Sequence, residues 1–237
     1  MKTYDYSGLL QSVCDKEASV YALVASQIDD IYDNYYKEHP FEFPINIEGL
    51  AKHLGITITY GDVNYYRSKL QASLVAQITK NENEFVVCVD KEMTDRFSRR
   101  YAIACSIAHY LYYKNSVKSF KATVSEQRLA NEYTDNIAID VITAFIIMPP
   151  KHTTEIISSY LDTVKNRHIE KDEIPAMLVD KLNFSLIHII NSWQYYRKLM
   201  CYMQSDACKN IIKYNLPKNL NNIDYIEDFQ TDNRFFI

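Results

Sequence analysis

The sequence predicts an α+β protein that is mainly helical, with a small twisted three-stranded sheet and a helical C-terminal part. Three observations support this. Apolar residues recur at helical spacing near the N-terminus and through most of the chain after residue 95. Three short runs between these stretches are rich in β-branched residues and have strand character. Residues 151–205 carry helical patterns alone. The expected organisation is a first domain over 1–150, a helical C-terminal subdomain over 151–208 and a tail over 209–237.

The N-terminal part is expected to form a long helix, a short helix and a first strand. Apolar positions at helical spacing indicate one amphipathic helix over 12–37. The prolines of HPFEFP (39–44) end it. A short helix then begins with Asn46 as its N-cap and stops at Gly55. It leads into the strand ITITY (56–60).

Two further strands and two central helices follow. ASLVAQI (72–78) and EFVVCVD (84–90) read as strands, and the TKNEN linker between them suits a hairpin. A helix is expected over 95–114, then a polar linker over 115–128. A second helix, over 129–147, is apolar on all sides near its end, which is typical of a buried helix.

The C-terminal part contains a helical pair over 174–200. The two helices join at NFS, where Ser185 is a candidate cap. The pair could be a DNA-binding helix-turn-helix, but few basic residues occupy its recognition face, which favours ordinary helical packing. The tail over 209–237 is rich in asparagine and ends in RFFI.

Composition excludes several function classes. Only 4 of 237 residues are glycine, and neither GxGxxG nor a P-loop pattern occurs. A net charge of −4 gives no global attraction to nucleic acid, so direct contact with it is not expected. The five cysteines include no CxxC pair, there is no signal-peptide pattern, and no apolar run approaches about 20 residues. A cytoplasmic protein without a membrane association is expected.

The stretch YAIACSIAHYLYY (101–113) has the outline of a zinc-peptidase helix without its zinc chemistry. Peptidases of the HExxH type bind zinc through two histidines four residues apart. A glutamate beside the first histidine acts as general base, and a second helix supplies a third ligand. Here one histidine of the pair is present, His109, and the glutamate is not.

The ordered set GLAKHLGITITY, RRYAIACSIAHYLYY and NIAIDVITAFIIMPP resembles the ImmA/IrrE family of metallopeptidase-like proteins over about residues 12–200. The resemblance implies a zincin-like core. It also implies a regulatory role, because such proteins often sit on phage or other mobile elements and relieve repression by cleaving or engaging a repressor.

Carried over to this chain, the family motif loses most of its chemistry. Cys105 stands where the first zinc histidine would be, Ser106 where the catalytic glutamate would be, and Asn136 where the glutamate ligand would be, while His109 keeps the second histidine. The other matched positions are Arg100, Tyr101, Ala104, Ala108 and Asp140.

These replacements predict a protein without peptidase activity. Ser106 has no partner base and cannot act as the general base, whose loss alone costs about 10² to 10⁴ in rate. Asn136 is neutral and a poor zinc ligand. We therefore expect no catalytic residue and no cofactor, and a degenerate pseudoenzyme that binds a protein or peptide, such as a repressor or a toxin-like partner. The strand over 72–78 is a candidate sheet edge for pairing with an extended segment.

Other interpretations of the same positions stay open. Cys105 and His109 are one helical turn apart, and in one interpretation they are ordinary core residues without a catalytic or metal-binding role. With Glu132 or Asp140 they could instead form a substitute zinc site, which would make the chain a metal-dependent endopeptidase. A Cys105–His109 nucleophilic dyad is disfavoured because amides in the middle of a helix are already bonded and offer no oxyanion hole.

Asp140 interrupts an otherwise apolar helix, and a buried carboxylate needs a partner. Arg99, Arg100 and His109 are the candidate partners. Such a pair is the expected use of the space that the zinc ligands would occupy.

Overall fold

The computed structural model describes residues 18–63, 74–81, 84–113, 119–125, 137–164 and 173–204. Within these ranges it is mainly helical with one small mixed sheet, so the predicted α+β class is confirmed. The helices are α2 (Ala18–Glu38), α3 (Ile47–His53), α4 (Arg96–Tyr113), α6 (Ile137–Ile147), α7 (Pro150–Thr163), α8 (Glu173–Leu182) and α9 (Leu186–Gln204). The strands are β1 (Ile56–Gly61), β2 (Leu74–Asn81), β3 (Glu84–Asp90) and β4 (Ser119–Ser125).

The sheet has the order β1-β3-β2-β4. β1 runs parallel to β3, and β2 runs antiparallel to both β3 and β4. The predicted β2–β3 hairpin is therefore present. Phe85, Val87 and Val89 alternate along β3 and are buried, as expected for the inner face of a strand.

Two sequence predictions about the sheet were wrong. Residues 119–125 form the fourth strand, although their polar composition had suggested a linker. The segment 72–78 is not a sheet edge, because β2 lies between β3 and β4. Both errors have one cause: β4 pairs with β2 across a long stretch of sequence, and such pairing leaves no local signature.

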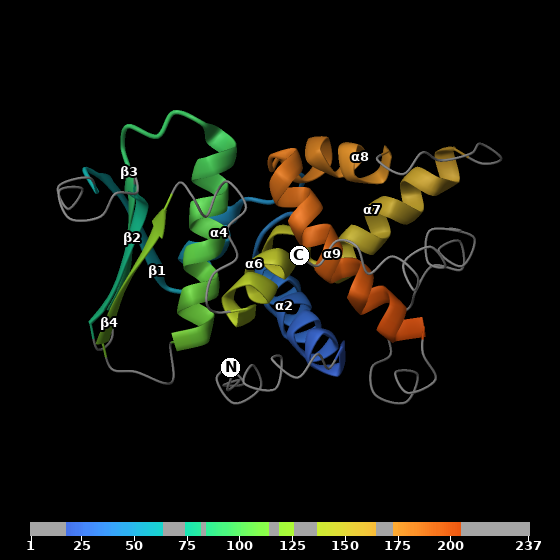
Figure 1. Cartoon of the computed structure of the whole chain (residues 1–237), viewed down its shortest axis with the longest axis horizontal. Coiled ribbons are helices and arrows are strands. Elements are labelled where there is room, and N and C mark those ends of the chain that lie inside the picture. The colour runs from blue at the N-terminus through green and yellow to red at the C-terminus, as the bar shows by residue number, and fades with distance from the viewer. Residues whose placement is uncertain are drawn as a thin grey trace, which may run out of the picture.

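Helix α4 lies between the sheet and helices α2, α6, α7, α8 and α9 (Figure 1). It contacts β2, β3 and β4 on one side and packs against α6 on the other. Residues 102–109 are buried without interruption, because the helix is covered from both sides. This layering places Cys105, Ser106 and His109 inside the protein.

A second part of the core joins α2, α6 and α9, which pack on one another. The hydroxyl of the buried Tyr32 donates to the carbonyl oxygen of Ile146, 2.7 Å away, at the end of α6. Helix α6 ends there because Pro149 and Pro150 carry no backbone N–H to continue it. The tyrosine therefore satisfies a carbonyl that the chain cannot satisfy locally.

Local signals at the helix ends match the structure. The side chain of Asn46 accepts a bond from the Gly49 amide at 2.9 Å, which confirms the predicted N-cap. Gly55 has a φ of +81°, so this glycine adopts the left-handed conformation that ends the segment. Asp95 caps α4, with its Oδ2 accepting from the Ser98 amide at 2.8 Å.

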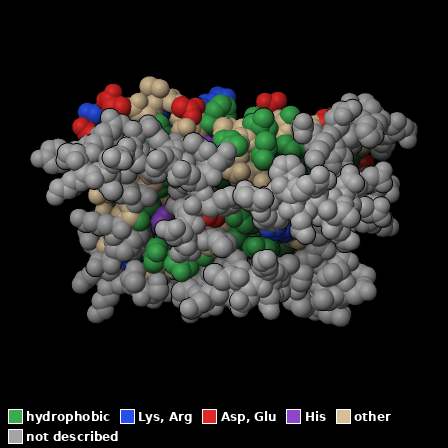
Figure 2. All heavy atoms as spheres, viewed as in Figure 1, with side chains coloured by type: hydrophobic (Ala, Val, Ile, Leu, Met, Phe, Trp, Pro, Cys, Tyr) green, Lys and Arg blue, Asp and Glu red, His purple; other side chains and the backbone are tan. Residues whose placement is uncertain are grey.

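The described surface is of mixed charge on the face shown in Figure 2, where acidic and basic side chains stand close together along the upper rim. Among the described residues, no helix combines the length and the apolar character that crossing a bilayer requires.

Candidate functional site

The three motif positions on α4 are all buried. Cys105 has an exposed fraction of 0%, Ser106 of 1% and His109 of 7%. The Ser106 hydroxyl donates to the carbonyl oxygen of Ala102 at 2.7 Å, one turn back in the same helix. This bond directs the hydroxyl proton into the helix backbone, so the side chain at the glutamate position is engaged in the core.

His109 lies in aromatic surroundings near the end of α4. Its ring stacks on Tyr113 with centroids 6.1 Å apart and an interplanar angle of 17°. The backbone carbonyl of Tyr113 in turn lies 3.4 Å from Nζ of Lys80, which comes from β2. The histidine is thus a buried residue in aromatic surroundings, as the core interpretation expects.

The arginines expected near Asp140 bind backbone oxygens. Nη2 of Arg99 donates to the Met93 carbonyl at 2.6 Å, and its guanidinium lies over the Tyr60 ring. Asp140 itself is half-buried in the first turn of α6, so it is less enclosed than the sequence suggests.

Arg100 connects three separate segments. Its Nη2 donates to the carbonyl oxygens of Ile45 at 2.8 Å and Leu182 at 3.3 Å, and its guanidinium stacks over Phe184. Burial lowers the pKa of Arg100. Arg100 is therefore a structural link between α4, the segment before α3 and the end of α8.

Two of the predicted vestigial or substitute ligands, Glu132 and Asn136, lie outside the described residues. The structure does describe Cys105, His109 and Asp140, and these three do not make up a group that could hold a metal ion. Within the described ranges, such a group is found at another place in the fold. Ligand atoms of Glu38, His39 and His53 lie within 4.8 Å of one another.

Sequence reasoning missed that cluster. His39 lies in HPFEFP and His53 in GLAKHLGI, which were interpreted as a helix breaker and a short helix. The residues come from two segments 14 positions apart, and the spacing matches no metal motif. The available signal for this cluster was the placement of the two histidines. His39 directly follows one helix, and His53 ends the next.

A further histidine, His152, is enclosed by rings. Its ring contacts Tyr32, Tyr36 and Phe41, with centroids 6.1, 5.3 and 4.7 Å away. Its Nδ1 lies 3.4 Å from a carboxylate oxygen of Glu155, and its buried Nε2 makes no hydrogen bond to the described residues. Burial lowers the pKa of His152, so the neutral ring is favoured.

Comparison with models of protein families and with curated proteins found no match for this chain. The ImmA/IrrE resemblance therefore stays a prediction based on the motifs.

Proposed function

We propose that this chain is a catalytically degenerate ImmA/IrrE-like pseudo-metallopeptidase that acts as a regulatory protein-binding module. The observation that supports this most is the state of Ser106. At the position of the general base it carries a hydroxyl, it is 1% exposed, and it is bonded to its own helix. Such a group does not activate a water molecule for attack on a peptide bond.

A zincin-like core is part of the same proposal. Its support is the position of α4 between a mixed sheet and the apolar helix α6. Helix α6 is the counterpart of the helix that supplies the third zinc ligand in the family. The burial of Cys105 and His109 on α4, a helix that packs against α6, fits a core that has lost the need for solvent and substrate to reach a metal.

The partner is proposed to be an extended protein segment, such as part of a repressor or of a toxin-like protein. Because β2 is an inner strand, it has no free edge for the partner segment. We propose instead that the segment pairs with β1, which among the described strands is paired with β3 alone. Thr57, Thr59 and Tyr60 are exposed along β1. Backbone pairing at such an edge needs no catalytic group.

The test is to purify the tag-free chain together with helix-turn-helix proteins encoded beside its gene and to measure the mass of each partner before and after incubation. The proposal expects a stable complex with a partner of unchanged mass. Cleavage of the partner that is lost in a His109→Ala variant would refute it and would support the alternative.

The alternative is a metal-dependent endopeptidase that uses Cys105, His109 and either Glu132 or Asp140 as substitute ligands. Residue types favour it, since thiolate, imidazole and carboxylate all bind zinc. It requires zinc bound at α4, so the metal content of the wild type and of a Cys105→Ala variant separates the two readings. Zinc in the wild type that is lost in this variant would support the peptidase.

A further inference from the structure

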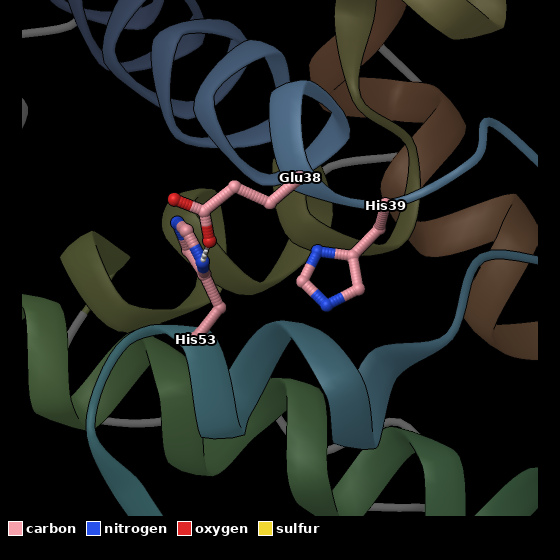
Figure 3. Close-up of side chains that lie close together, drawn as sticks. All are labelled: Glu38, His39 and His53. Atoms are coloured by element: carbon pink, nitrogen blue, oxygen red, sulfur yellow. Dashed lines mark ion pairs between the residues drawn. The ribbon is translucent and has the colours of Figure 1, made fainter.

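The C-terminal ends of α2 and α3 meet at a group of side chains suited to a metal ion. Glu38 is the last residue of α2, His39 follows it directly, and His53 is the last residue of α3. Figure 3 shows the three side chains in the space between the two helices. This place is separate from α4 and its motif positions.

The donor atoms are already close to the spacing that a bound metal needs. Nδ1 of His53 lies 3.5 Å from Oε2 of Glu38. Two ligands of a tetrahedral zinc ion, each about 2.0–2.1 Å from the metal, lie roughly 3.3 Å apart. The ligand atoms of all three residues lie within 4.8 Å of one another, and His39 and Glu38 are exposed, so an ion can reach them from solvent.

The ring of His39 is held by its neighbours. Its Nδ1 lies 3.0 Å from the carbonyl oxygen of Tyr35, and the two rings stack with centroids 4.3 Å apart. A carbonyl only accepts, so this contact favours the proton on Nδ1 and leaves the lone pair on Nε2. A backbone carbonyl bonded to the other ring nitrogen is the usual support for a metal-binding histidine.

Tyr35 also orders the second histidine. Its ring makes an edge contact with His53 at 5.6 Å, and the tyrosine itself is 3% exposed. Gly49 leaves room for it, because a Cβ there would lie 2.5 Å from the Tyr35 hydroxyl oxygen. The buried Tyr35 ring therefore contacts both imidazoles and restricts their positions.

Charge at this place favours a cation. Carbonyl groups at the last turn of a helix carry partial negative charge, and α2 and α3 both end here. The Glu38 side chain adds a full negative charge, while the nearby Lys37 is directed to the side-chain oxygen of Asn34 at 2.8 Å.

We propose that Glu38, His39 and His53 bind a divalent transition metal of the zinc class. Two imidazoles and one carboxylate suit zinc rather than magnesium, which prefers oxygen ligands. Three protein ligands leave a fourth position for water or for a group from another molecule. The ion would tie the end of α2 to the end of α3. This site does not depend on the function proposed for the α4 region.

The experiment is a calorimetric titration of the tag-free, chelator-treated chain with zinc chloride, and in parallel with magnesium chloride. We expect one equivalent of zinc to bind and magnesium to give no saturable signal. Glu38→Gln, His39→Ala and His53→Ala should each weaken zinc binding about tenfold or more. Glu92→Gln, which changes an exposed carboxylate outside the cluster, should bind zinc as the wild type does.

Circular dichroism of every variant checks the fold, and two of the three substitutions change exposed side chains. Cobalt replaces zinc for a second readout, since a cobalt site with a cysteine ligand shows a thiolate charge-transfer band. The proposed site predicts no such band. Absence of saturable zinc binding would overturn the proposal. Unchanged affinity in the three variants would do so too, as would a thiolate band that disappears in Cys105→Ala.

Discussion

The hydroxyl of Tyr32 offers the most direct test of how the core is held together. It is buried and donates to the Ile146 carbonyl at 2.7 Å. Residues three and four positions after Ile146 are both proline, so the backbone cannot supply a substitute donor. Tyr32→Phe keeps the ring and removes the donor. A buried carbonyl left without a partner costs about 1–3 kcal/mol, and we expect about 2 kcal/mol here.

Urea unfolding followed by circular dichroism measures this loss. With an m-value of about 2–3 kcal/mol/M, the midpoint should fall by roughly 0.7–1 M while the slope stays unchanged. Tyr60→Phe is the matched control. Its hydroxyl donates to Glu48 at an exposed place, so its loss should change stability by less than about 0.5 kcal/mol. A Tyr32→Phe midpoint equal to that of the control would show that the Ile146 carbonyl finds another donor, and the reasoning would fail.

Three more predictions use the same unfolding assay. Arg100→Met removes the guanidinium from the Ile45 and Leu182 carbonyls and should lower stability by about 2–3 kcal/mol, with Arg100→Lys intermediate. Asp95→Ala should lower stability by about 1 kcal/mol at neutral pH through loss of the α4 cap. Burial acts to raise the pKa of Asp95, but amide and hydroxyl hydrogen bonds outweigh it and the pKa is lowered. The cap's contribution should therefore be complete above about pH 4 and disappear as pH falls through the folded-state pKa. Burial lowers the pKa of His152, so the wild type should lose stability as pH falls below about 6.5, and His152→Gln should lose less over that range.

Each of these has a result that contradicts it. An Arg100→Met midpoint near that of the wild type would mean that water replaces the guanidinium at both carbonyls. Equal losses for Asp95→Ala at pH 7 and pH 2 would remove the ionised carboxylate from the explanation. Parallel pH curves for the wild type and His152→Gln would show that the ring accepts a proton without cost.

The elements with a strong local signal could be predicted from the sequence. The Asn46 cap, the Gly55 stop and the β2–β3 hairpin depend on residues a few positions apart, and all three are present. The burial of α6 followed from its apolar character on every side. The strand β4 was missed because a polar segment of this kind can be recognised as a strand only from its pairing, here with β2.

The site was harder, and for a similar reason. The burial of Cys105 and His109 matches the core interpretation, and their one-turn spacing could be read directly. The meeting of Glu38 and His39 with His53 depends on how two helices cross, which no short-range pattern encodes. The role of Arg100 was likewise hidden, because its acceptors are backbone carbonyls and carry no side-chain signature.

The packing of α2 against α9 has a consequence for synthesis on the ribosome. Part of the apolar face of α2 is covered by α9, a helix made more than 140 residues later, and Tyr21 meets Tyr195 with ring centroids 6.0 Å apart. At about 5–20 residues per second, that face waits on the order of ten seconds or longer for its partner. During this interval the α9-facing side of α2 stays uncovered on the nascent chain, so it is a surface through which the incomplete chain can aggregate.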